Sequence, residues 1–120
     1  MNKRVKQKYG KRYREEKLYD LCDYLAKDIL ANLRVFERFH GSIPAPLCGP
    51  DGKRDAGEAG REWHEILRKM IWSFDQHVRD NPDEPWKKGY ALDSEEEKAY
   101  KELVKDGYHL FAEYFEYLWL

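Results

Sequence analysis

Apolar residues recur at helical spacing in three separate stretches of the chain. Residues 15–39, 60–80 and 94–119 repeat apolar positions at i, i+3, i+4 and i+7, which predicts three amphipathic helices. We expect the first buried stripe to comprise Leu18, Leu21, Cys22, Leu25, Ile29, Leu33 and Phe36. Three such helices in 120 residues favour an all-α fold, a small three-helix bundle with two long loops and a basic N-terminal arm.

Local signals mark the loops and one helix start. Glycine and proline are dense between residues 40 and 59, so this stretch is predicted to be a loop. Ser94 and Glu97 have the spacing of a capping box, which predicts that the third helix begins beside them. Gly107 falls on the apolar stripe of that helix, where it weakens helix propensity. We therefore expect Gly107 to allow close packing against another helix.

A second group of aromatic and basic side chains lies off the predicted stripes. At about 100° per residue, Trp72 points away from the apolar face of its helix, which is centred near Leu67 and Phe74. The arginines on that side are Arg61, Arg68 and Arg79. The aromatic residues off the stripe of the third helix are Tyr108, Phe115 and Trp119. Either these side chains pack beneath the loops and the arm, or they form a second surface, as a subunit interface or a ligand pocket.

Charge is distributed unevenly along the chain, although the net charge is −1. Residues 1–14 carry seven basic side chains and no acidic one, and the remainder carries 15 basic against 23 acidic side chains. The basic residues of the arm are Lys3, Arg4, Lys6, Lys8, Lys11, Arg12 and Arg14. This pattern divides the chain into a basic arm, 1–14, and a single helical domain, 15–120. The arm is either a solvated tail or oligomer contact, or a segment that binds nucleic acid.

No catalytic or metal-binding motif is complete. His64-Glu65 begins a zincin-like pattern, but the position of the second histidine holds Arg68. Two cysteines, Cys22 and Cys48, are too few for a disulfide framework. No apolar run reaches the ~20 residues of a membrane span. We therefore expect a protein that is not an enzyme, has no cofactor and no metal, and does not enter a membrane.

The second and third helices carry the residues of a recognisable pattern. The stretches EWHEILRKMIWSFD and DGYHLFAEYFEYLWL resemble an uncharacterised family of small helical proteins encoded by tailed bacteriophages and prophages. The residues that match are Trp63, Leu67, Met70, Ile71, Phe74, Gly107, Leu110, Phe111, Tyr114, Phe115, Leu118 and Trp119. One departure is Ala31, where the family would have proline. The resemblance implies a phage origin and the cytoplasm of the host cell, and it carries no activity with it.

Three hypotheses for function follow from these features. The first is a homo-oligomeric sponge that holds a nucleotide-derived immune signal of the host, with aromatic rings stacked on the base and arginines on the phosphates. Its candidate ligand-binding residues are Arg61, Arg68, Trp72, Arg79, Tyr108, Phe115 and Trp119. The second is an adaptor or inhibitor that binds a host or phage protein through the same patch. The third is nucleic-acid binding through the basic arm.

Overall fold

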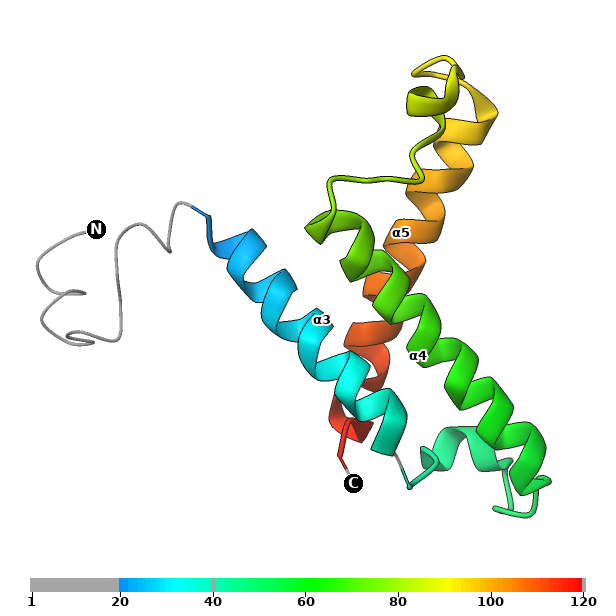
Figure 1. The fold of residues 1–120 in the computed structure, drawn as a ribbon. Helices are drawn as coiled ribbons and strands as arrows, with labels where there is room; N and C mark the ends of the chain where they lie inside the picture. The colour runs from blue at the N-terminus through cyan, green and yellow to red at the C-terminus, as the bar shows by residue number, and fades with distance from the viewer. Residues whose placement is uncertain (1–19, 40, 120) are drawn as a thin grey trace, which may run out of the picture.

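The computed structural model describes residues 20–39 and 41–119. These residues form three α-helices and three short 3-10 helices, and no strand (Figure 1). In chain order the elements are α3 (Leu21–Phe39), η2 (Ala45–Cys48), α4 (Ala56–Val78), η3 (Pro85–Lys88), α5 (Glu95–Tyr114) and η4 (Phe115–Tyr117). The all-α, three-helix prediction is confirmed. The basic arm, 1–14, lies outside the described residues.

Helix α4 is the centre of the fold, and the other two helices pack against it (Figure 1). Over their described lengths, α3 and α5 have no pair of Cα atoms within 8 Å of each other, although each approaches α4 closely. The bundle is therefore open: the two outer helices meet only through their side chains.

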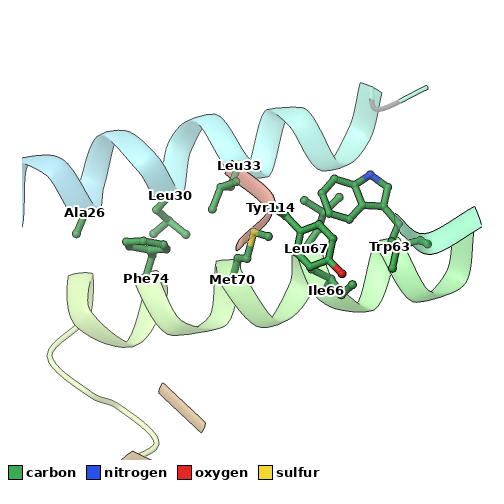
Figure 2. Close-up of a cluster of buried hydrophobic side chains, with 10 residues drawn as sticks. Ala26, Leu30, Leu33, Trp63, Ile66, Leu67, Met70, Phe74 and Tyr114 are labelled. Carbon is green, nitrogen blue, oxygen red and sulfur yellow. The ribbon is translucent and has the colours of Figure 1, made fainter. Parts of the chain in front are cut away.

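The core follows one face of α4. Trp63, Leu67 and Met70 have no exposed surface, and they point toward α3 and the end of α5 (Figure 2). Phe74 continues this face and packs edge-on against Phe111, with 5.2 Å between ring centroids. Each fully buried side chain of this size contributes about 1.5–3 kcal/mol by leaving water. The predicted apolar face of this helix is thus the one that the structure buries.

The buried face of α3 differs from the predicted stripe. Ala26, Leu30 and Leu33 are buried, whereas Leu21 and Leu25 are 40% and 50% exposed. Cys22 is exposed as well, so the expectation that it is a core residue was wrong; Leu18 lies outside the described residues. The physical reason is that, among the described elements, only the backbone of α4 approaches that of α3, so a narrow face of α3 covers the contact. The remaining apolar residues of α3 stay at the surface.

Two polar side chains cap the longer helices. Asp55 accepts a hydrogen bond from the backbone N–H of Glu58 at 3.0 Å, so α4 begins at Ala56, earlier than predicted. Ser94 accepts from the N–H of Glu97 at 3.2 Å, as expected at the start of α5. The carboxylate of Glu97, however, accepts a bond from the N–H of Trp86 at 2.6 Å. That bond ties the preceding loop to the first turn of α5.

Gly107 lies where α5 crosses α4. A Cβ atom at this position would be 1.8 Å from Oγ of Ser73 and 2.6 Å from the carbonyl oxygen of Lys69. Both distances are far below van der Waals contact, so only glycine fits. The expectation that Gly107 permits close helix packing is confirmed.

Candidate functional site

Trp72 lies at the junction of α4 and α5. The sequence placed it on the outer side of α4, but its indole is partly buried and packs edge-on against Tyr100, with 5.8 Å between ring centroids. Its Nε1–H donates to Oδ2 of Asp83 at 3.2 Å. The reason for the difference is that the N-terminal half of α5 covers this side of α4. Trp72 therefore packs between α4 and α5, and part of its side chain remains at the surface.

A polar network surrounds the buried end of Trp72. The hydroxyl of Tyr100 lies 2.8 Å from Oε1 of Gln76 and 3.0 Å from Oδ1 of Asn81, so its one proton is shared between these two acceptors. Nε2 of Gln76 donates to Oδ2 of Asp83 at 2.6 Å, and the same oxygen accepts the hydrogen bond from Nε1–H of Trp72. Burial raises the pKa of Tyr100 to about 12, so its hydroxyl stays protonated and able to donate even above pH 10. The network fixes the loop after α4 against both helices.

The three candidate arginines do not share one site. Arg68 lines the same pocket as Trp72, and its side chain is mostly exposed, with Nη1 3.6 Å from Glu37. Arg61 lines a different pocket. Arg79 is held by Asp75, with hydrogen bonds of 2.6 to 3.0 Å from its Nε and Nη2.

Asp75 is the centre of an ion-pair cluster. Besides Arg79, it accepts a bond from Arg34 of α3 at 2.9 Å. Hydrogen bonding by Arg79, with added attraction from Arg34, lowers the pKa of Asp75 below its ordinary value. Arg79 is thus held by Asp75, four residues earlier in the chain, and Arg34 supplies the bridge from Asp75 to α3. Arg79 does not line the pocket that contains Trp72.

The pocket that contains Arg68 and Trp72, here called the α4–α5 pocket, has a volume of about 540 Å³. This volume is in the range of small-molecule sites. Its charged and titratable residues are Arg68, Lys69, Asp106, His109 and Glu113, and Leu103 and Leu110 complete the lining with Trp72. The lining of this pocket therefore combines basic and acidic side chains with aromatic and aliphatic ones.

The three aromatic candidates of the third predicted helix are also separated, because Tyr108 lies in α5, Phe115 in η4 and Trp119 beyond η4. Tyr108 belongs to the core, because its ring packs against Phe74 at 5.0 Å between centroids. Phe115 is 60% exposed and packs on Phe111 at the C-terminal end of the helix. Trp119 is 60% exposed as well. None of these three lines the pocket of Trp72, so the single aromatic and arginine patch expected from the sequence is not one surface.

A second concave surface, here called the α3–α5 groove, lies between the two outer helices. Its volume is about 520 Å³, and its lining is mainly apolar. Its apolar lining residues are Ile29, Leu33, Val35, Phe36, Phe39, Phe111, Phe115 and Leu118. Asp28 and Asn32 are its polar residues. The open arrangement of the bundle produces this groove, because the backbones of α3 and α5 do not touch.

Sequence reasoning found one residue of this groove, Phe115, among its candidates. It missed Val35 and Phe39, which are 55% and 65% exposed. The signal was present in the sequence, since these two residues fall at helical spacing from Leu21 and Leu25. They were overlooked because a single buried stripe was expected on α3.

The described residues contain no group of three or more His, Cys, Asp or Glu side chains that could hold a metal ion. Within the same part of the chain, no helix combines the length and the apolar character needed to cross a membrane. The candidate nucleic-acid residues of the arm, 1–14, lie outside the described residues. Comparison with known proteins finds no matching family model, no matching curated protein and no matching solved structure.

Proposed function

We propose that this protein is a protein-binding module that docks an amphipathic helix of another polypeptide in the α3–α5 groove. The observation that carries the proposal is the exposure of large apolar side chains along one concave surface. Val35, Phe39 and Phe115 each present more than half of their surface to solvent there. An apolar groove between two helices is a common receptor for the apolar face of a third helix.

Physical chemistry supports an occupied groove. Apolar surface in contact with water costs about 25 cal/mol per Å², so covering several aromatic rings and a valine stabilises a complex. Aromatic side chains are also enriched at the energetic centres of protein interfaces. Asp28 and Asn32 interrupt the apolar lining. A docked helix then needs a polar side chain opposite these two residues, and this requirement gives the groove selectivity as well as affinity.

The role that fits this surface is that of an adaptor or inhibitor that acts by binding. The resemblance to small proteins of tailed phages remains a prediction, and it makes host and phage proteins the first partners to test. A second copy of the chain is equally a polypeptide that the groove can receive.

Site-specific photo-crosslinking tests the proposal. Phe115 is replaced by p-benzoylphenylalanine, the full chain is expressed in bacteria, and the cells are irradiated. We expect an adduct of discrete mass, with the same chain or with another protein. The matched control carries the probe at Tyr90, an exposed aromatic residue of the loop before α5. Adding Val35→Glu to the Phe115 probe should abolish the adduct, because a buried carboxylate is costly in an apolar interface.

The result that would overturn the proposal is the absence of any adduct at Phe115. Identical adducts from the Phe115 and Tyr90 probes would overturn it as well, because they would reflect nonspecific contact. Circular dichroism of each purified variant shows whether the helices are retained.

A second candidate function is the binding of a small anionic aromatic molecule, of nucleotide type, in the α4–α5 pocket. The observation that favours it is that Trp72 lies in one pocket with three basic or titratable side chains, Arg68, Lys69 and His109. A ring and a guanidinium are the groups that contact a base and a phosphate. Of the residues proposed from the sequence for this role, only Arg68 and Trp72 contribute to the pocket.

Titration calorimetry with a panel of nucleoside monophosphates and cyclic dinucleotides tests this second function. We expect binding that Arg68→Ala weakens at least 10-fold, whereas Arg61→Ala, at a residue that does not line this pocket, leaves it unchanged. Titrations without heat for the whole panel would exclude nucleotides from this pocket, and equal losses in both variants would show that the pocket is not the site.

A further inference from the structure

The outward face of α3 carries a regular pattern that the packing of the monomer does not use. Its residues follow one another at intervals of 4, 3, 4, 3 and 4: Leu21, Leu25, Asp28, Asn32, Val35 and Phe39. All six are exposed, and the last four line the α3–α5 groove. Alternating steps of three and four are the spacing of a coiled-coil seam, in which two helices pack along their whole length. We call this set the outer seam of α3.

The outer seam is complementary to itself when two copies run in opposite directions. In the register in which paired residue numbers add up to 60, Leu21 faces Phe39 of the other copy and Leu25 faces Val35. Asp28 then faces Asn32. Every apolar residue meets an apolar residue, and each polar residue meets a polar one. Because the arrangement is symmetric, each of these three pairs occurs twice, as a two-fold interface requires.

We propose, on the basis of the docking function given above, that the occupant of the α3–α5 groove is α3 of a second copy, packed antiparallel in this register. The proposal names the partner and the orientation. It adds to the docking function a defined symmetric dimer, in which the outer seams of both copies are covered together.

The central pair decides the orientation. In a parallel dimer Asp28 would face Asp28, and two carboxylates at close range in an interface repel each other. In the antiparallel register each Asp28 carboxylate meets the Asn32 side chain of the other copy. One N–H of Asn32 already donates to the backbone oxygen of Asp28 in its own helix at 2.7 Å, and its second N–H is available to a carboxylate across the interface. A polar pair at one level of an apolar seam also fixes the register.

The ends and flanks of the seam fit the same arrangement. Leu21 and Leu25 of the second copy come to lie over Phe39 and Val35, which line the groove together with Phe115. The leucines are exposed in the monomer because α4 does not reach them, and the groove supplies the apolar surface that they lack. Along the flank, Arg38 of one copy approaches Tyr24 of the other, an aromatic ring and a cation rather than two like charges.

Engineered cysteines test the register. In the full chain with Cys22→Ser and Cys48→Ser, the double variant Leu25→Cys/Val35→Cys should form a covalent dimer on mild oxidation, because position 25 faces position 35 of the other copy. The single variants are the matched controls. In the antiparallel register two copies of position 25 are ten residues apart along the axis, about 15 Å, which a disulfide cannot span. Efficient dimerisation of Leu25→Cys alone would overturn the orientation.

A charge exchange tests the central pair in the unmodified cysteine background. Light scattering coupled to gel filtration should give about twice the chain mass of 14.5 kDa. Asn32→Asp places carboxylates opposite each other and should weaken the dimer at least 10-fold. The double variant Asp28→Asn/Asn32→Asp exchanges the two partners and should restore it. Failure of the exchange to restore a dimer that Asn32→Asp has weakened would refute the proposed pairing.

The outcomes separate this inference from the docking function. A chain that is monomeric at every concentration, with a crosslink from Phe115 to a different protein, overturns the dimer and leaves the docking function supported. A monomer without any crosslink overturns both. A dimer whose formation is indifferent to Val35→Glu and to Asn32→Asp shows self-association through another surface, and it too overturns the inference.

Discussion

Replacing Gly107 by alanine tests the close approach of α4 and α5 directly. In an open helix this change stabilises by about 1 kcal/mol, because alanine has the higher helix propensity. Here the added Cβ would stand 1.8 Å from Oγ of Ser73 and 2.6 Å from a backbone oxygen of α4. A rotamer change can move the hydroxyl but not the backbone oxygen, so the two helices must separate. Overpacking of this kind costs typically about 1–3 kcal/mol, and the backbone clash places Gly107→Ala at the upper end. The net result is a loss of about 2 kcal/mol.

Urea unfolding followed by tryptophan fluorescence measures this loss, and a thermal scan should show a decrease of roughly 10 °C in Tm. Gly60→Ala is the matched control: Gly60 also lies inside a helix, but its added Cβ would have Ile43 as its nearest neighbour at 3.9 Å, an ordinary contact. We expect that variant to be more stable by about 0.5–1 kcal/mol. Adding Ser73→Gly to Gly107→Ala should recover only part of the loss, because the backbone clash remains. If Gly107→Ala were as stable as the natural chain, the reasoning about helix crossing would be refuted.

Three further predictions concern buried polar groups. Asp75→Asn should cost about 1 kcal/mol at pH 7, because its arginine partners are largely exposed and screened. Since the folded pKa of Asp75 lies below the unfolded value, this stabilisation is present above about pH 4 and lost on further acidification, so an acid titration should be shallower for the variant. Tyr100→Phe should cost about 1 kcal/mol of unfolding free energy. Burial raises the pKa of Tyr100 to about 12, so the stabilisation by its hydroxyl is complete below pH 10, the ordinary pKa, and is lost as the pH passes 12. Absorbance at 295 nm should show that the variant lacks one late-titrating tyrosine. Glu97→Ala leaves the N–H of Trp86 without its acceptor, and hydrogen exchange at that amide should accelerate, whereas an unchanged rate would show that the bond does not hold the loop.

The sequence predicted the fold well where a single physical cause dominates. Helical periodicity located all three helices, and Gly107 revealed a close helix crossing, because only one residue type fits there. The helix boundaries differ from the predicted ones where a capping residue determines them. Asp55 caps α4, so this helix begins earlier than the glycine-rich stretch suggested. Glu97 has capping-box spacing, but its side chain binds the backbone of Trp86. Spacing identifies a helix start, and only the surrounding loop decides which N–H the carboxylate meets.

The candidate site was predicted less well, for a reason that lies in the packing angles. A helical wheel gives the direction of Trp72 relative to its own helix, but not the side from which α5 approaches. The arginines near it were likewise assigned to one face, whereas Arg79 had a nearer partner in Asp75. Helix α3 has two apolar faces side by side, and the prediction of one buried stripe assigned Leu21 and Leu25 of the outer face to the core. Knowledge of which neighbours each helix has is needed to separate the faces, and this is a tertiary property.

The central position of α4 has a consequence for how the chain folds. Each approach between helix backbones joins elements that are neighbours in the chain, α3 with α4 or α4 with α5. The fold is thus two helical hairpins that share their middle helix, and neither hairpin requires the ends of the chain to meet. Such local topology favours folding in microseconds to milliseconds. It also allows α3 to detach while the α4–α5 hairpin keeps its own contacts, so amides of α4 should be the last to exchange with solvent.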